Sequence, residues 1–269
     1  MYSIGMQDIP ATGKSRLDGL LANADDWALF IDIDGTLLDM APTPDAVRVP
    51  HGLVKTLTQL DTTFSGAVGL ITGRRLADAD RFFAPLKLAA TGVHGTEARG
   101  EDGDTIMLAR PVPPTLTEAV CEVARTIPGI LVEEKGAGLA IHYRNAPEAR
   151  ADLELQLRQT IRGWEGYALR RGRKVLDLVP RDHSKATGLA WLMQLTVFKG
   201  RRPVMIGDDH GDEPAMEAAE NLGGVGLKVA GEHFSRSGAD FSSPARVRDW
   251  LASLATPEAA SSTAPTQHL

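Results

Sequence analysis

One segment, residues 28–37, constrains the fold more than any other stretch of the chain. It reads ALFIDIDGTL, an apolar run that ends in two carboxylates, Asp32 and Asp34, followed by Gly-Thr. A short apolar run of this kind is typical of a buried strand in a parallel sheet, and open α/β sheets place their chemistry where such strands end. Because side chains alternate along a strand, we expect Asp32 and Asp34 to share one side while Ile33 points away. Two carboxylates so close repel each other, so the segment predicts a divalent cation between them or a proton on one, and both conditions suit phosphoryl transfer.

The two outer thirds of the chain alternate strands with helices. The pattern predicts strands over 27–33, 66–72, 88–93, 203–206 and 224–229, and helices over 49–62, 76–83, 184–195, 213–220 and 244–254. This alternation with short loops builds a parallel sheet through right-handed crossovers. We therefore predict an α/β fold, a Rossmann-like parallel-sheet core with helices on both faces.

The middle third has a different pattern. Pro111, Pro113 and Pro114 mark a boundary, and a helix is expected over 115–126. Two pairs of strand-like runs follow, each with glycine between its members, and a helix separates the pairs; the expected ranges are 130–135 and 139–144, then 147–163, then 167–171 and 174–179. Hairpins and helices in this order predict a compact α+β unit.

These patterns divide the chain into a discontinuous core and an insertion. The core is predicted to comprise residues 1–111 and 181–255, and the inserted α+β domain residues 112–180, docked over the C-terminal edge of the core sheet. Residues 256–269 are small and polar, so we expect a disordered tail.

Composition excludes several classes of protein. The chain has 269 residues, of which 43% are hydrophobic, and a net charge of -6, which is ordinary for a soluble globular protein and unlike the basic surface of a nucleic-acid binder. Its single cysteine, Cys121, permits no disulfide within the chain and fits a reducing compartment. With no leader and no apolar run of spanning length, we expect a cytoplasmic protein without a membrane partner, and a monomer.

Four groups of chemically reactive side chains follow one another, three of them at predicted strand ends. They are Asp32 with Asp34, Thr72 in ITGR, Lys185 at a helix start, and Asp208, Asp209 and Asp212 in GDDHGDE. One carboxylate can attack phosphorus while a second protonates the leaving alcohol and then activates water. A hydroxyl and an ammonium can bind the phosphoryl oxygens, and acidic oxygens suit Mg²⁺. Each group alone has a plainer interpretation: acids in a turn, a helix cap, a solvated lysine, or a surface acidic loop or calcium site.

In this order, the four groups resemble the motifs of haloacid-dehalogenase-like phosphohydrolases. The resemblance implies that Asp32 is the nucleophile, which forms an aspartyl-phosphate, and that Asp34 is the general acid and base. It implies that Thr72 and Lys185 bind the transferring phosphoryl group. The insertion lies between the second and third motifs, as in members with a large α/β cap.

The same resemblance implies a Mg²⁺ site. Asp208 would bind the ion together with the carboxylate of Asp32 and the backbone carbonyl of Asp34. Asp209 and Asp212 would complete or support this set of ligands.

Three further stretches, GVHGTE, VEEKGAGLAIHYR and GRKVLDLVP, are similar to motifs of the trehalose-6-phosphate phosphatase family. This narrower resemblance covers most of the chain and implies trehalose 6-phosphate as the small-molecule substrate. It carries Glu133, Lys135 and Asp177 over as ligands of the sugar hydroxyls and His94 as a residue near the site entrance. Arg74, from ITGR, is also expected to bind substrate.

The chain departs from that family at two positions. Asp177 stands where the family usually has glutamate, which puts its reach to the sugar in question, and Ala186 stands where glycine usually follows the lysine of the third motif. From the residues alone, Glu133 and Lys135 share a face if their stretch is a strand, and a plain salt bridge between strands is the alternative.

Other residues have structural interpretations. We expect His142 and Tyr143 to be structural, with one side chain packed in and the other facing out, and the basic run 170–174 to be a solvated face, although one of its cations could attract the substrate dianion. The tryptophans in helical patterns are expected in the core: Trp164, Trp191 and Trp250.

The predicted function is Mg²⁺-dependent hydrolysis of trehalose 6-phosphate to trehalose and phosphate, the last step of trehalose synthesis. Three alternatives stay open: a phosphatase of another sugar phosphate (a glucosyl or mannosyl glycerate or glycerol phosphate, or sucrose phosphate), a signalling receiver domain, and a non-catalytic sugar-phosphate sensor. Asp34 and the large insertion argue against a receiver, and the complete set of reactive groups argues against a sensor.

Overall fold

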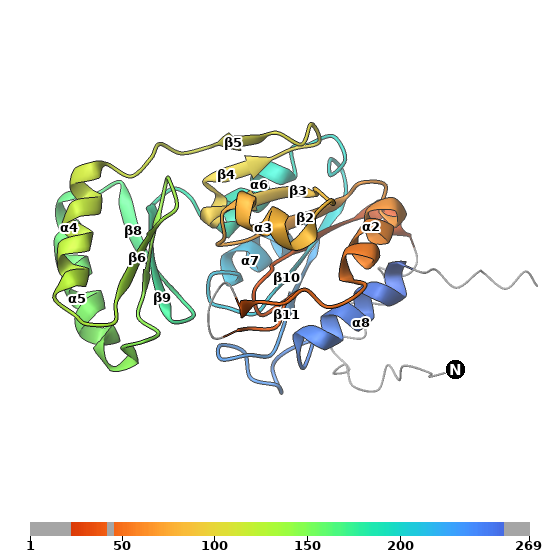
Figure 1. Ribbon diagram of the computed structural model, residues 1–269. Helices are drawn as coiled ribbons and strands as arrows, with labels where there is room; N and C mark the ends of the chain where they lie inside the picture. Colours follow the sequence, from red (N-terminus) through yellow and green to blue (C-terminus); the bar gives the residue numbers. More distant parts are fainter. Residues whose placement is uncertain (1–22, 42–45, 256–269) are drawn as a thin grey trace, which may run out of the picture.

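The computed structural model describes residues 23–41 and 46–255, which form two units lying side by side (Figure 1). The larger unit, called the core, is built on a seven-stranded sheet, and the smaller unit, called the cap, on a four-stranded sheet. Each unit has its own cluster of buried apolar side chains. The predicted tail, residues 256–269, lies outside the described residues.

The core sheet has the strand order β11-β10-β1-β2-β3-β4-β5. Five of its strands are parallel: β1 (Trp27–Ile31), β2 (Val68–Ile71), β3 (Ala89–Gly92), β10 (Arg202–Gly207) and β11 (Val225–Lys228). Strand β1 lies between β10 and β2, and its register pairs Phe30 with Met205 on one side and with Gly69 on the other. Every side chain of β1 is buried, because helices cover both faces of the sheet, and this burial explains its unbroken apolar run. The predicted α/β fold is confirmed.

Two strands at one edge of the core sheet were not predicted. β4 (Glu97–Arg99) and β5 (Thr105–Met107) extend the sheet in antiparallel fashion beyond β3. Each has three residues. Strand β4 is buried but carries two charged residues, and all three side chains of β5 are exposed. Neither segment therefore has the apolar run or the alternation that predicts a strand.

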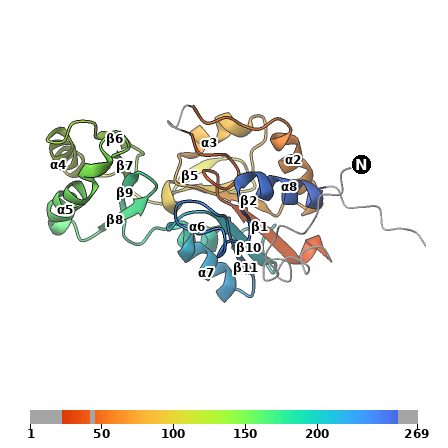
Figure 2. The same cartoon turned by 90° about the horizontal axis from the view of Figure 1, so that it is seen from below.

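Helices cover both faces of the core sheet, as predicted (Figure 2). One face carries α2 (Leu53–Thr63), α3 (Leu76–Phe83) and α8 (Pro244–Ala255), and the other carries α6 (Lys185–Leu192) and α7 (Glu213–Asn221). Helix α2 begins four residues later than predicted, since Gly52, with φ of +84°, precedes its first residue as the N-cap. Helix α6 begins after Ser184, whose side chain accepts a hydrogen bond from the amide of Thr187 in a capping box.

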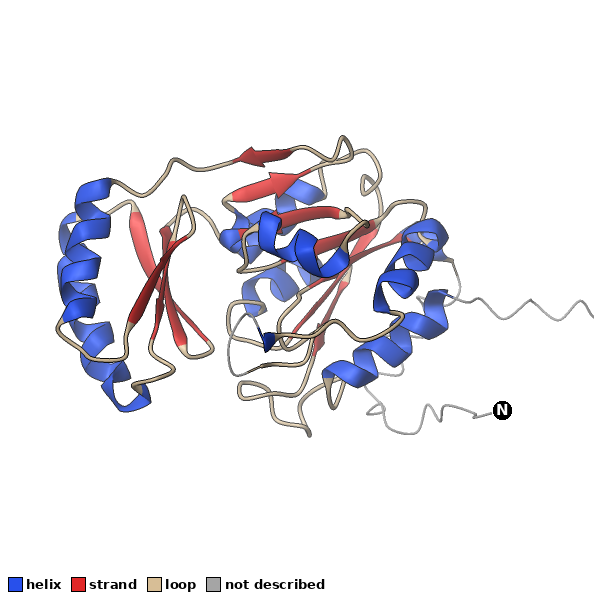
Figure 3. Ribbon diagram, in the orientation of Figure 1, coloured by secondary structure: helices blue, strands red, loops and turns tan. Residues whose placement is uncertain are grey.

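The cap packs two helices against one face of an antiparallel sheet, with strand order β6-β7-β9-β8. Its elements are α4 (Pro114–Arg125), β6 (Leu131–Glu134), β7 (Leu139–His142), α5 (Arg150–Thr160), β8 (Tyr167–Gly172) and β9 (Val175–Pro180). The helices lie on the outer side, so the other face of the cap sheet is turned toward the core (Figure 3). Side chains alternate accordingly: Leu176 and Leu178 enter the cap's apolar cluster, whereas Asp177 lies on the face toward the core.

The domain limits at residues 112 and 180 stay a prediction, which the two separate apolar clusters support. Trp250 is buried in the core cluster, while Trp191 packs against that cluster and Trp164 against the cluster of the cap, as predicted. Among the described residues, no helix combines the length and the apolar character that crossing a membrane requires.

Candidate active site

The loop after β1 brings two carboxylates to the end of the sheet. The strand ends at Ile31, two residues before the predicted end, and Asp32 and Asp34 both line the cleft that opens there. Gly35 has φ of +85°, and a Cβ placed on it would lie 2.2 Å from Oδ2 of Asp208. The loop can therefore turn this closely past Asp208 only with glycine at position 35.

Lys185 connects two elements of the site. Its Nζ donates to Oδ1 of Asp32 at 2.8 Å and to Oδ1 of Asp212 at 2.7 Å. The side chains of these three residues are at most 5% exposed. Burial alone would lower the pKa of Lys185, but Asp212 and Asp32 hold it well above its usual range. The lysine therefore remains a cation in contact with Asp32.

Three buried carboxylates converge at the same place. Ligand oxygens of Asp32, Asp208 and Asp212 lie within 4.8 Å of one another. Burial raises the pKa of Asp32 to about 7 against the opposing effect of Lys185, and burial together with Asp209 and Asp212 raises the pKa of Asp208 to about 7. Lys185 alone does not neutralise the three carboxylates, so a further cation would stabilise the cluster. A compact set of hard oxygen donors fits Mg²⁺, so these residues suit the ion that the sequence analysis expects.

Two of the expected metal ligands have side chains outside this cluster. Asp209 accepts from the amide of Gly211 at 2.8 Å and lies 3.9 Å from Nζ of Lys185. Asp34 turns its carboxylate to Arg74, whose Nη2 donates to Oδ1 at 2.6 Å. For Asp34, the expected ligand is the backbone carbonyl, and its role stays a prediction.

The motif after β2 places Thr72 and Arg74 differently. The hydroxyl of Thr72 accepts from the amide of Arg74 at 3.1 Å, and Thr72 is buried and does not line the cleft. Arg74 does line it, with its guanidinium 4.8 Å from the centre of the Phe82 ring. Burial opposes the charge of Arg74, but the hydrogen bond to Asp34 raises its pKa. Arg74 is thus well placed to orient Asp34.

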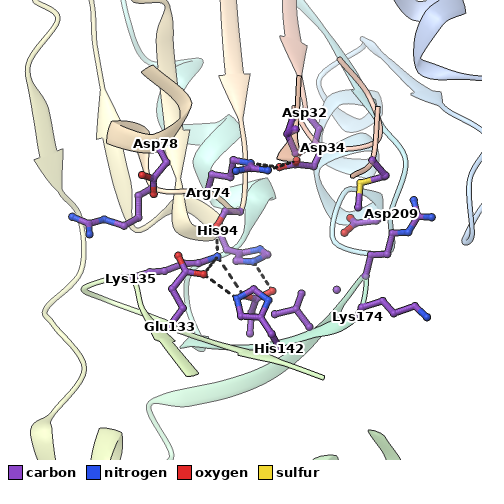
Figure 4. Close-up of a pocket in the computed structure, with 18 of the residues that line it drawn as sticks. Asp32, Asp34, Arg74, Asp78, His94, Glu133, Lys135, His142, Lys174 and Asp209 are labelled. Carbon is purple, nitrogen blue, oxygen red and sulfur yellow. Dashed lines mark hydrogen bonds and ion pairs between the residues drawn. The ribbon is translucent and has the colours of Figure 1, made fainter. Parts of the chain in front are cut away.

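The cap faces these groups across the cleft with a polar surface (Figure 4). Lys135 donates through Nζ to the carbonyl of Gly73 at 3.1 Å and lies 3.9 Å from Oε2 of Glu133. Nε2 of His142 lies 2.9 Å from the same Glu133 oxygen, and this hydrogen bond lowers the pKa of Glu133. Glu133 and Lys135 therefore share a face as predicted, and their contact is one part of a wider network.

A strained turn of the core brings His94 to the cap. Val93 and His94 have φ of +45° and +54°, values that non-glycine residues rarely adopt. Nε2 of His94 lies 3.2 Å from Oδ2 of Asp177, at ion-pair distance. Burial would raise the pKa of Asp177, but His94 and then Lys135 lower it to about 2. Asp177 is therefore an ionised carboxylate at the boundary between core and cap.

The two surfaces enclose a cleft of about 530 Å³. It is lined by all of the expected site residues except Thr72 and Asp212. The cleft is also lined by His142 and Arg144, which were not expected there. Arg173 and Lys174 of the basic run line it too, where a cation that attracts the substrate was an open possibility. As predicted, one of the two side chains packs in and the other faces out: Tyr143 is buried, and His142 lines the cleft. The position of His142 does not indicate the purely structural role expected for it. The β6–β7 register pairs Glu133 with Ala140, so His142, two residues further along β7, lies diagonally opposite Glu133 on the same face. A predicted hairpin register is the signal that could have placed the two side chains together.

Residues 30–248 match the sequence model of one protein family, described as trehalose-phosphatase. The chain belongs to the trehalose-phosphatase family. The matched range includes the whole cleft and both sheets apart from the first three residues of β1.

Individual relatives agree with this family assignment. The chain is 37% identical over 221 residues to a probable trehalose-phosphate phosphatase of Sinorhizobium fredii, which covers 81% of this chain and 83% of that protein. It is 35% identical over 205 residues to trehalose-6-phosphate phosphatase of Escherichia coli, covering 76% of this chain and 77% of the relative. The fold matches that of the C-terminal domain of Candida albicans trehalose-6-phosphate phosphatase with a TM-score of 0.77, at 18% identity over 92% of this chain and 98% of that one.

Proposed function

We propose that this member of the trehalose-phosphatase family is a Mg²⁺-dependent phosphomonoesterase that hydrolyses trehalose 6-phosphate to trehalose and inorganic phosphate. The observation that carries the proposal is the cleft itself. Asp32, buried and in contact with Lys185, lies on one wall, and the polar cap surface around Glu133 and Lys135 forms the other. A substrate whose phosphoryl group lies at Asp32 would place its sugar against the cap surface.

In the first step, a carboxylate oxygen of Asp32 attacks phosphorus. The bond from phosphorus to the sugar oxygen breaks, and an aspartyl-phosphate forms. Asp34, oriented by Arg74, gives its proton to the leaving sugar oxygen. Lys185 neutralises charge on the phosphoryl oxygens. The contact of the Thr72 hydroxyl with a phosphoryl oxygen stays a prediction, because Thr72 is buried and does not line the cleft.

In the second step, Asp34 removes a proton from a water molecule, whose oxygen attacks phosphorus. The bond between phosphorus and Asp32 breaks, which releases inorganic phosphate, restores the Asp32 carboxylate and leaves Asp34 protonated, as the next first step requires. Asp32, Asp208 and Asp212 would hold the metal. When bound, Mg²⁺ supplies positive charge that offsets the carboxylates and the transferring phosphoryl group.

The cap supplies groups that recognise hydroxyls. Carboxylates accept and ammonium groups donate hydrogen bonds, so Glu133, Lys135 and Asp177 can each bind a sugar hydroxyl, and His142 can orient Glu133. Contacts such as that between Lys135 and Gly73 hold the cap against the core. Closure of this kind keeps bulk water from the reacting groups.

The direct test is phosphate release by the purified protein from a panel of sugar phosphates, with Mg²⁺ and with EDTA. We expect trehalose 6-phosphate to be hydrolysed with a kcat/KM at least ~10-fold above that for sucrose 6-phosphate or glucose 6-phosphate, the range that a few polar contacts supply, and EDTA to abolish turnover. Preference for another ester would contradict the substrate, and full activity in EDTA would contradict the metal. Asp26→Asn, which alters an exposed carboxylate six residues before Asp32 that does not line the cleft, serves as the control for Asp32→Asn.

A phosphatase of another sugar phosphate is the second candidate. The observation that favours it is Asp177, whose carboxylate already pairs with His94 at 3.2 Å and so has less capacity left for a sugar hydroxyl. The same substrate panel decides between the two. A monomeric state and a cytoplasmic location complete the proposal, the location supported by the presence of a single cysteine, Cys121.

A further inference from the structure

A second group of metal-ligating side chains lies outside the cleft. His210, Glu213 and His233 offer two imidazole nitrogens and a carboxylate, all within 4.8 Å of one another. Nδ1 of His210 is 2.7 Å from Oε2 of Glu213, and Nε2 of His233 is 3.3 Å from Oε1 of the same residue. Each carboxylate oxygen therefore faces a different imidazole. The two rings lie with centroids 5.3 Å apart and an interplanar angle of 62°, and one nitrogen of each ring approaches the carboxylate of Glu213.

The three residues come from two segments that also bound the active site. His210 lies between Asp208 and Asp212 in the GDDHGDE loop, and Glu213 is the first residue of α7. His233 belongs to the loop that follows β11, where Phe234 packs against its ring at 4.5 Å. The cluster thus joins the loop of the carboxylate site to a loop 20 residues farther along the chain.

The donor set differs in kind from that of the carboxylate cluster. Asp32, Asp208 and Asp212 present only hard oxygens, which suit Mg²⁺. Two imidazoles and one carboxylate suit Zn²⁺ and similar transition-metal ions, which bind such sets tetrahedrally and leave a fourth position to water. Nitrogen and oxygen ligands lie about 2.0–2.2 Å from zinc, so donor atoms around the ion are roughly 3.3 Å apart. The two imidazole nitrogens lie 2.7 and 3.3 Å from oxygens of Glu213, close to that spacing.

We propose that His210, Glu213 and His233 form a second metal site, for Zn²⁺ or an ion of the same class, beside the carboxylate site that serves the proposed function. A bound ion replaces the protons that the two imidazoles share with Glu213. The exposed positions of His210 and His233 leave the ion an open path from solvent.

Occupation of this site would restrain the loop that carries His233. In that loop, Gly231 lies next to Asp208, with its Cβ position 3.5 Å from Oδ2, and Glu232 accepts from Nη2 of Arg173 of the cap at 3.0 Å. An ion that holds His233 to Glu213 therefore also holds the neighbours of His233 against the carboxylate site and the cap. The second site would stabilise the arrangement in which core and cap are in contact.

The test is binding of Co²⁺ and Zn²⁺ to the full-length protein in saturating Mg²⁺. Tetrahedral Co²⁺ with imidazole ligands absorbs strongly in the visible, whereas octahedral Co²⁺ bound by oxygens absorbs weakly, so the spectrum distinguishes the two sites without any activity measurement. We expect one strongly absorbing Co²⁺ per wild-type chain, displaced by Zn²⁺. In His233→Ala and Glu213→Gln we expect at least a ~10-fold weaker affinity, since a ligand is lost. His51→Ala, which removes an exposed histidine elsewhere, should bind as the wild type does.

Amide hydrogen exchange gives an independent readout. We expect Zn²⁺ to slow exchange over residues 229–234 in the wild type and to have no effect there in His233→Ala, whose folding is verified by circular dichroism. Wild-type affinity in both ligand variants would place the ion elsewhere and overturn the proposal. A weak octahedral Co²⁺ spectrum alone would leave the three residues as two ordinary hydrogen bonds and would overturn it as well. Because the spectrum needs no turnover, either result stands apart from the outcome of the phosphatase assay.

Discussion

The two walls of the cleft differ in how firmly their charged groups are held. On the core wall, Lys185 is bonded to Asp32 and to Asp212, and the exposed fractions of these side chains do not exceed 5%. On the cap wall, Lys135 and Asp177 are 12% and 7% exposed, but the side chain of Glu133 is 43% exposed and that of His142 is 28% exposed. Charges buried in mutual contact keep a fixed geometry and strong electrostatic effects, which suits bond breaking. Half-exposed groups can adjust and exchange water for hydroxyls, which suits recognition. Substitutions on the core wall should therefore lower the hydrolysis of every phosphate ester equally. Substitutions on the cap wall should lower only the hydrolysis of esters whose sugar contacts the cap.

The largest expected effect comes from the core wall. In Asp32→Asn, the amide cannot form the covalent intermediate, so we expect kcat to fall by at least ~10³-fold for both trehalose 6-phosphate and p-nitrophenyl phosphate. Phosphate release measures the loss, and circular dichroism with thermal unfolding verifies that the variant folds. If the variant kept more than a tenth of the activity on either ester, Asp32 would not be the nucleophile.

A smaller and selective effect should follow from the cap wall. In Glu133→Ala, we expect KM for trehalose 6-phosphate to rise about 10-fold, the equivalent of one hydrogen bond to a charged group. KM for p-nitrophenyl phosphate should not change, because that ester has no sugar. Glu134→Ala is the matched control, since this neighbour on β6 is exposed and does not line the cleft. Equal changes in KM for both esters would show that Glu133 does not contact the sugar, and would contradict the proposed difference between the two walls.

The contact between the walls should appear in the pH dependence of stability. The pKa of Asp177 is about 2 in the folded protein against an ordinary value of 3.8. Its ionised carboxylate therefore stabilises the folded state above about pH 4, by about 2 kcal/mol. This stabilisation is lost as pH falls from about 4 toward 2. Urea unfolding of the wild type and of Asp177→Asn should show the larger difference at pH 6 and a narrowing difference below pH 4; a difference independent of pH would contradict the ion pair with His94.

The smallest effect is expected at the outer margin of the two units. Arg173 of the cap and Glu232 of the core form a 3.0 Å pair whose side chains are 30% and 56% exposed. Solvent screens such pairs, so Arg173→Gln should reduce the free energy of unfolding by less than about 1 kcal/mol. A double-mutant cycle with Glu232→Gln measures the coupling. A coupling well above that value would mean that the margin, and not only the buried contacts, holds core and cap together.

What could be predicted from the sequence depended on burial. The apolar run before Asp32 and the helical spacing over 76–83 predicted β1 and α3, because buried faces impose regular patterns. The edge strand Thr105–Met107 has no buried face and left no pattern to find. Strand ends also placed most of the candidate site residues, since parallel strands deliver their carboxyl ends to one edge of the sheet.

Side-chain partners were much less predictable than positions. The pairing of Arg74 with Asp34 and that of His94 with Asp177 join residues 40 and 83 positions apart. No spacing rule reaches that far, because these contacts depend on how whole elements pack. Likewise, the sequence groups Asp208, Asp209 and Asp212 together, whereas the fold puts only the first and the last beside Asp32.

The turn at Gly35 has a consequence for anyone who wishes to redesign this molecule. The Cβ of any larger residue there would lie 2.2 Å from Oδ2 of Asp208, well inside van der Waals contact, and the residue would have to adopt φ of +85°, which side chains disfavour. Saturation mutagenesis around the first motif should consequently recover active variants at neighbouring positions but only glycine at position 35. Substitutions in the cap can therefore change substrate selectivity, whereas position 35 beside the reacting carboxylates has no space for a side chain.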